Sequence, residues 1–89
     1  MVSVVMATFN GEKYLEKQLN SILMQTLLPD EILIFDDRSV DKTEEIVNQF
    51  IKKNTTSVEI KFVKNETNLG YALNFYQGLK YARGDYIFE

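Results

Sequence analysis

Cysteine and histidine are both absent from this 89-residue sequence. Without cysteine the chain forms no disulfide and no thiolate zinc site. Without histidine it has neither a Ser–His or Cys–His nucleophile pair nor a histidine general base. Any chemistry must therefore rest on carboxylates, amides, hydroxyls, lysine, arginine or a bound metal ion.

Long apolar runs are missing as well. No stretch approaches the roughly 20 apolar residues that cross a bilayer. The first six residues, Met-Val-Ser-Val-Val-Met, lack the basic region and cleavage site of a signal peptide. These absences predict a cytoplasmic location.

Basic residues are few and do not cluster: the net charge is −3 at pH 7. This argues against nucleic acid as a partner, because phosphate backbones are bound by grouped lysines and arginines. An apolar share of 45% is ordinary for a globular protein. The length allows one domain at most.

Apolar runs and amphipathic segments alternate along the chain. Runs rich in β-branched residues predict strands, and apolar residues at helical spacing predict helices. Strands are expected at 2–7, 31–35, 58–63 and 85–89, and helices at 12–26, from 41 onwards and at 71–82. Asp41 with Glu44 three residues later suggests a variant capping box for the second helix, and Gly84 is expected to end the third helix. The residues expected to face inward from the second and third helices are Ile46, Val47, Phe50, Ile51, Ala72, Phe75, Tyr76 and Leu79.

The resulting order, β-α-β-α-β-α-β, implies parallel strands joined by right-handed crossovers. The predicted fold is an open three-layer α/β/α sandwich with a mostly parallel sheet, in which the strand at 58–63 alternates as an edge strand does. Ligands of such folds bind at the carboxyl ends of the strands. That edge would carry the segments 8–11, 36–39 and 64–70.

These segments hold an aromatic ring, Phe9, and two adjacent carboxylates, Asp36 and Asp37. An aromatic face beside a carboxylate acceptor suits a nucleobase, which needs stacking and a partner for its ring N–H. The phosphate-binding glycine motifs of dinucleotide-binding and P-loop proteins are absent. A diphosphate bound here would need a metal ion or residues beyond position 89 to neutralise it.

The sequence resembles the family-2 glycosyltransferases, an inverting group with the Rossmann-like GT-A fold. Four segments carry the resemblance, in order and at the usual spacing: Val2 to Gly11; Tyr14-Leu15 with Leu19-x-Ser21-Ile22-Leu23-x-Gln25-Thr26; Glu31 to Ser39 followed by x-Asp41-x-Thr43; and Asn68-x-Gly70 with Ala82-x-Gly84-Asp85-Tyr86-Ile87. Ala7 is a departure, because the family more often has proline or threonine there. The contact of that residue with the base runs largely through its backbone, so binding remains compatible with alanine.

The resemblance implies a role for each residue of the predicted site. Phe9 would pack on the pyrimidine, Asp37 would accept its N3–H, and Asp36 would be the neighbour of Asp37 at the strand end. Asn68, Gly70 and Asn74 fall in the segment that closes over the nucleotide. The full set of expected nucleotide-binding residues is Ala7, Thr8, Phe9, Asp36, Asp37, Asn68, Gly70 and Asn74.

For the parent enzyme the resemblance implies inverting transfer of a hexosyl-type sugar. The donor would be a UDP- or dTDP-type nucleotide sugar, and the acceptor a hydroxyl of a glycan or lipid-linked molecule in polysaccharide or surface-glycan synthesis. A manganese or magnesium ion would be held by an Asp-x-Asp motif after the fourth strand, and the sequence stops just before it, at Phe88-Glu89. Residues 1–89 are thus expected to be the N-terminal nucleotide-binding part of the domain, with no catalytic or metal-binding residue of their own and no activity alone. The parent is expected in the cytoplasm or at the inner face of the membrane.

Each residue also has a purely structural interpretation. Phe9 would close the core at a strand end, Asp36 would satisfy loop amides, and Arg38 would be a solvated surface charge. Turn, capping or packing roles are expected for Ser39, Asp41, Asp85, Tyr14, Tyr76 and Tyr81.

Three other classes of protein are alternatives to this interpretation. A phospho-accepting signalling module places its acidic pair after the first strand, whereas here it follows the second. A dinucleotide-binding domain needs the missing glycine fingerprint. A folded scaffold that forms a homodimer through an exposed fourth strand remains an alternative.

Overall fold

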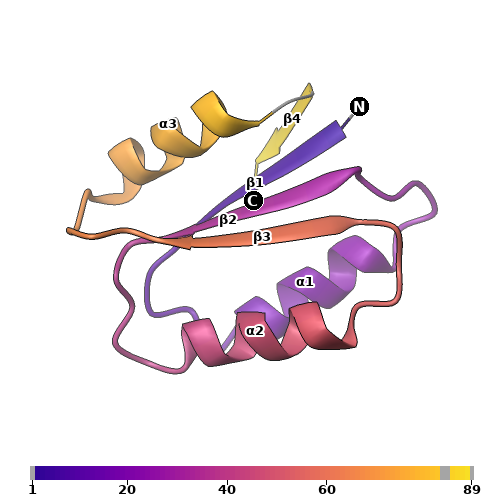
Figure 1. The fold of residues 1–89 in the computed structure, drawn as a ribbon, viewed down its shortest axis with the longest axis horizontal. Helices are drawn as coiled ribbons and strands as arrows, with labels where there is room; N and C mark the ends of the chain where they lie inside the picture. Colours follow the sequence, from indigo (N-terminus) through magenta and orange to yellow (C-terminus); the bar gives the residue numbers. More distant parts are fainter. Residues whose placement is uncertain (1, 83–84, 89) are drawn as a thin grey trace.

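The computed structural model describes residues 2–82 and 85–88, which form a single parallel sheet with helices on both faces (Figure 1). The elements are β1 (Val2–Thr8), α1 (Leu15–Leu23), β2 (Glu31–Asp36), α2 (Thr43–Lys53), β3 (Glu59–Lys64), α3 (Tyr71–Tyr81) and β4 (Asp85–Phe88). The strand order is β3-β2-β1-β4, and every pair is parallel. The predicted α/β class, the alternating order and the edge position of β3 are confirmed. The expectations that Gly84 ends α3 and that the last strand reaches Glu89 fall on residues outside the described part.

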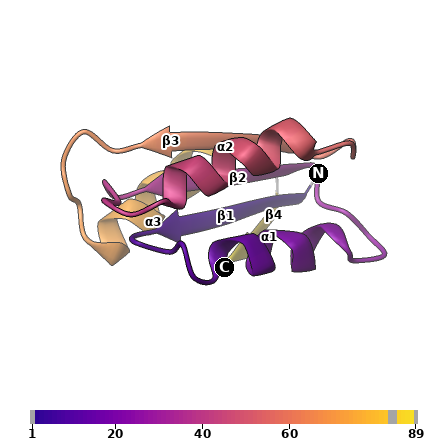
Figure 2. The ribbon, with the colours of Figure 1, turned by 90° about the horizontal axis from the view of Figure 1, so that it is seen from below.

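The two faces of the sheet differ in their cover. Helices α1 and α2 lie side by side on one face, and α3 lies alone on the other (Figures 1 and 2). The main apolar core is on the two-helix side and comprises Val4, Met6, Leu15, Leu19, Ile22, Ile32, Ile34, Val47 and Val58. The side chains of β1 and β2 alternate between the faces, so Val5, Leu33 and Phe35 are buried toward α3. None of the described helices has the length and apolarity needed to cross a membrane.

Helix α1 starts later and ends earlier than the sequence predicts. The chain turns first at Gly11, whose carbonyl accepts the amides of Tyr14 (3.1 Å) and Leu15 (2.9 Å). Regular helix begins at Leu15 and ends at Leu23, where the amides of the next two residues bond back to Asn20 and Ile22. In α2 most of the expected inward face is confirmed: Val47 is fully buried and Phe50 and Ile51 pack against the core, whereas Ile46 is half-buried and is not part of that cluster.

The prediction for the inward face of α3 is partly wrong. Phe75 and Leu79 are half-buried, but Ala72 and Tyr76 are exposed, and the buried residues are Asn74 and Gly78. The cause is a close approach of the helix to the sheet. A side chain at Gly78 would begin 2.6 Å from Val5 Cγ1, and Asn74 Nδ2 donates to the Phe35 carbonyl at 2.8 Å. A polar residue and a glycine thus face the sheet, at two positions that the apolar pattern of the helix does not mark.

Candidate functional site

A cavity of about 420 Å³ opens at the carboxyl edge of the sheet, between the loops that follow β1, β2 and β3. Its lining residues are Ala7, Thr8, Phe9, Tyr14, Asp37, Asn68, Gly70, Tyr71 and Asn74. Every residue predicted for the site is among them except Asp36. The structure therefore brings together residues that lie up to 67 positions apart in the sequence (from Ala7 to Asn74).

Two aromatic residues at this cavity were missed by the sequence analysis. Tyr14 was expected to be a packing residue, and Tyr71 received no role, yet both line the cavity with side chains that are 48% and 70% exposed. Tyr14 folds back over the turn because Gly11 has no side chain: a Cβ there would lie 2.9 Å from the Tyr14 ring. The available signal was position, since Tyr71 directly follows the predicted loop at 65–70. Together with Phe9, which is 54% exposed, these residues give the cavity three aromatic rings.

Among the described residues that line the cavity, Asp37 is the only carboxylate, and it is 6% exposed. Its Oδ1 accepts the Leu69 amide at 2.6 Å and the Asn65 side chain at 3.1 Å. Its Oδ2 accepts the Gly70 amide at 2.9 Å. Burial by itself raises the pKa of the Asp37 carboxyl, but these hydrogen bonds outweigh it and hold the pKa below its ordinary value of 3.8. The group is therefore an ionised acceptor at neutral pH.

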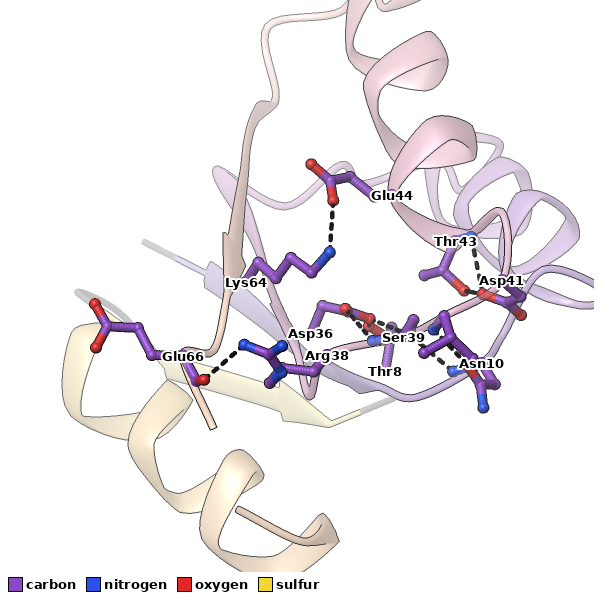
Figure 3. A network of polar contacts seen from close by, with 11 residues as sticks. Thr8, Asn10, Asp36, Arg38, Ser39, Asp41, Thr43, Glu44, Lys64 and Glu66 are labelled. Carbon is purple, nitrogen blue, oxygen red and sulfur yellow. Dashed lines mark hydrogen bonds and ion pairs between the residues drawn. The ribbon is translucent and has the colours of Figure 1, made fainter. Parts of the chain in front are cut away.

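The same contacts fix the loop between β3 and α3 against the β2 end. Asn68 donates its side-chain amide to the Asp37 carbonyl at 2.7 Å, and Arg38 donates to the Glu66 carbonyl at 2.7 Å (Figure 3). Gly70 has φ of +85°, a backbone conformation that side chains disfavour. Arg38 is thus exposed, as expected of a surface charge, and also holds the loop.

Asp36 lies outside the cavity and is completely buried. Its carboxylate accepts the Thr8 hydroxyl at 2.7 Å, and the Ser39 amide and hydroxyl at 2.8 and 2.5 Å (Figure 3). Ser39 in turn accepts the Asn10 amide at 2.8 Å. These contacts match the structural interpretation, in which Asp36 satisfies loop groups. They also fix the segment that carries Phe9 to the end of β2.

Asp41 lies just before α2 and makes the turn contacts expected of it, but the N-cap residue of the helix is Lys42. One carboxylate oxygen accepts both the amide and the hydroxyl of Thr43, and the other accepts the Glu12 amide at 3.1 Å. The expected pairing with Glu44 in a capping box is wrong, because Glu44 instead forms an ion pair with Lys64 at 3.2 Å (Figure 3). Because Lys42 is the N-cap residue, Glu44 is only the second residue of the helix, one position too early for such a box.

We predict that acid weakens the fold partly through Asp41. Burial raises the pKa of this carboxyl, but hydrogen bonds from Thr43 and Glu12 lower it by more. The pKa of Asp41 therefore lies below its ordinary value of 3.8. A carboxyl whose pKa is depressed in the folded state contributes stability above its unfolded pKa and loses it as pH falls through the folded value. Urea unfolding at pH 7 and at about pH 2.5 should therefore show a smaller acid loss for Asp41→Asn than for the unchanged protein. Equal acid losses in the two proteins would contradict this prediction.

Among the residues whose side chains the structure describes, no group of three or more carboxylates is arranged so that it could hold a metal ion.

The fold and the cavity define a parallel α/β domain that presents aromatic rings and one ionised carboxylate at the strand ends. The sequence profile of glycosyl transferase family 2 matches residues 3–89, and the chain belongs to this family. An uncharacterised glycosyltransferase of Methanocaldococcus jannaschii is 40% identical over 98% of this chain and 30% of its own length. An abequosyltransferase of Salmonella typhimurium is 38% identical over 97% of this chain and 26% of its own length.

Solved structures agree with this membership. TarS of S. aureus, residues 1–349 in complex with UDP, is 32% identical and has a TM-score of 0.83, covering 99% of this chain and 26% of the TarS chain. A mannosyltransferase of Pyrobaculum calidifontis, solved with GDP-Man and Mn²⁺, is 24% identical with a TM-score of 0.83 over 93% of this chain and 24% of its own, which shows the shared fold. The chain spans about a third or less of the length of these proteins.

Proposed function

We propose that this protein binds the nucleotide part of a UDP- or dTDP-type sugar donor at the cavity beside β1 and β2. The observation that carries the proposal is the pairing of aromatic rings with the Asp37 carboxylate in one cavity. Its volume, about 420 Å³, lies in the range of small-molecule sites, about 300–1,000 Å³. The complex of the relative TarS with UDP supports the same class of ligand.

The hydrogen bonds of Asp37 leave room for a base. A carboxylate offers about four lone-pair positions, of which Oδ1 uses two and Oδ2 uses one. Oδ2 therefore retains an acceptor position for the ring N–H of uracil or thymine. Cytosine presents an acceptor at that ring nitrogen, so its lone pair would face a carboxylate.

The activity of the whole enzyme follows as a further part of the proposal. Residues 1–89 serve as the donor-binding part of a glycosyltransferase that transfers a sugar to an acceptor hydroxyl of a glycan or lipid-linked molecule. The abequosyltransferase among the relatives supports sugar transfer by the whole enzyme, and polysaccharide or surface-glycan synthesis is the process proposed for it. Other residues of the enzyme supply the catalytic base and hold a divalent ion, manganese or magnesium. The enzyme works in the cytoplasm or at the inner face of the membrane.

Nucleotide binding is tested by following backbone amide shifts during titration with UDP, dTDP and CDP, each with and without Mn²⁺. We expect UDP and dTDP to shift residues around Phe9, Asp37 and Asn68 with Kd in the range of roughly 0.1–5 mM, and CDP to bind at least about fivefold more weakly. Phe9→Ala should weaken UDP binding by about fivefold or more, since base stacking on an aromatic ring is worth roughly 1–3 kcal/mol. Absence of shifts at about 10 mM UDP would contradict donor binding by this chain.

A second candidate role is self-association through β4. This strand pairs with β1 and lies at the edge of the described sheet, and an edge strand exposes backbone groups that a second copy can pair with. Light scattering over a concentration series would detect a homodimer. A constant monomer mass would exclude this role.

A further inference from the structure

Three amide side chains form a connected network behind Asp37. Asn65, directly after β3, donates its Nδ2 group both to Asp37 Oδ1 (3.1 Å) and to Asn74 Oδ1 (2.8 Å). Gln77 donates to Asn65 Oδ1 at 2.6 Å and to Asn74 Oδ1 at 3.0 Å. Asn65 and Asn74 are 8% and 1% exposed. The network therefore joins the candidate carboxylate to helix α3 through buried groups.

The orientation of every amide in this network is determined. The Phe35 carbonyl can only accept, so Asn74 must present its Nδ2 group there and its oxygen to the network. The acceptors Asn74 Oδ1 and Asp37 Oδ1 then require the Nδ2 group of Asn65, whose oxygen faces the Gln77 donor. No amide can flip without setting two acceptors or two donors against each other. Such a network restricts Asp37 to one orientation.

Asn65 and Gln77 lie outside the candidate cavity. Neither is among its lining residues, and Gln77 instead lines a separate cavity of about 320 Å³ between α3 and the sheet. Any effect of Asn65 on a nucleotide must therefore pass through Asp37 or Asn74. This separation distinguishes a positioning residue from a ligand-binding one.

We propose that Asn65, itself oriented by Gln77 and Asn74, is a positioning residue that aims the Asp37 carboxylate at the base of the nucleotide donor. The inference rests on the proposed function of the cavity. Hydrogen bonds from Asn65 and from the Leu69 amide occupy both acceptor positions of Asp37 Oδ1. Oδ2, which accepts only the Gly70 amide, is therefore the oxygen available to the ligand. Without Asn65 the carboxylate can rotate, and its two oxygens compete for the Leu69 and Gly70 amides.

The test compares Asn65→Ala with the unchanged protein in UDP titrations and in an NMR titration of the Asp37 side-chain carboxyl. UDP affinity should fall about five- to twentyfold at pH 7, where the carboxylate is ionised in both proteins. The Asp37 carboxyl should also titrate at a higher pH in the variant, because one stabilising donor to the charged form is gone. Gln77→Ala should move both readouts in the same direction by less, since it acts through Asn65.

Asn54→Ala is the matched control. Asn54 also joins backbone groups through its side-chain amide, donating to the Val58 carbonyl at 2.9 Å and accepting the Thr56 amide at 3.0 Å, but it lies between α2 and β3, away from the cavity. The substitution Asn54→Ala should leave UDP affinity and the Asp37 titration unchanged, even where it lowers the stability of the fold.

The outcomes separate this inference from the proposed function. UDP binding by the unchanged protein with an unaltered affinity in Asn65→Ala would overturn the positioning role and leave the proposed function standing. A normal Asp37 titration in Asn65→Ala would also overturn it. Failure of the unchanged protein to bind UDP would overturn both together.

Discussion

Asp37→Ala should lower UDP affinity on the order of tenfold to a hundredfold. The substitution removes the acceptor proposed for the base. It also removes the partner of the Leu69 and Gly70 amides, which donate to the carboxylate at 2.6 and 2.9 Å, and Gly70 lines the cavity. Hydrogen bonds to a charged group are worth about 1.5–3 kcal/mol. Titration of the variant with UDP, followed by NMR, measures the loss.

Asp37 also holds the loop at 68–70 through the Leu69 and Gly70 amides, and a second effect tests this role. Asp37→Asn keeps the size of the side chain, but its NH₂ group must face at least one backbone amide donor, so the loop at 68–70 should move as it does in Asp37→Ala. Amide exchange of Leu69 and Gly70 should therefore speed up in both variants. Asp30→Ala serves as the control, because Asp30 accepts the Val2 amide at 2.7 Å at the opposite edge of the sheet. UDP binding retained by Asp37→Ala would contradict the site.

The fold could be predicted from the sequence because its signals are local. Short β-branched runs and helical spacing of Leu15, Leu19 and Ile22 specify element type without reference to the rest of the chain. The alternation of Ile60 and Phe62 with charged neighbours specified the edge strand. Once the elements alternate as β-α-β, few parallel arrangements remain. The position of the cavity follows from that topology alone.

The sequence does not predict contacts between elements that are far apart in the chain, because these contacts depend on the direction in which each side chain points. Asp36 and Asp37 are adjacent and chemically identical, yet Asp36, the last residue of β2, makes the loop contacts, whereas Asp37, directly after the strand, lines the cavity. The network of Asn65, Asn74 and Gln77 joins two elements through amides that carry no periodic signal. The inward face of α3 was predicted wrongly for the same reason. The helix contacts the sheet through Asn74 and Gly78 rather than through its large apolar residues.

The close contact of Gly78 with the sheet predicts a large effect on the free energy of unfolding. Gly78→Val should lower the free energy of unfolding by about 3 kcal/mol or more, which is at the upper end for overpacking. The new Cβ would lie 2.6 Å from Val5 Cγ1 and 3.0 Å from Phe35 Cδ2. Both neighbours are buried, at 0% and 3% exposure, so they cannot move aside into solvent. Gly78→Ala should cost less, because better helix propensity offsets about 1 kcal/mol.

Urea unfolding followed by circular dichroism measures these changes, with Ala72→Val as the control on the exposed face of the same helix. The control should change stability by no more than about 0.5 kcal/mol, which reflects the lower helix propensity of valine. Stabilities of both Gly78 variants within about 0.5 kcal/mol of the unchanged protein would mean that α3 does not approach the sheet this closely. If the helix is displaced, Asn74 must leave the Phe35 carbonyl and the amide network opens. Gly78→Val should therefore weaken UDP binding as well, although Gly78 does not line the cavity.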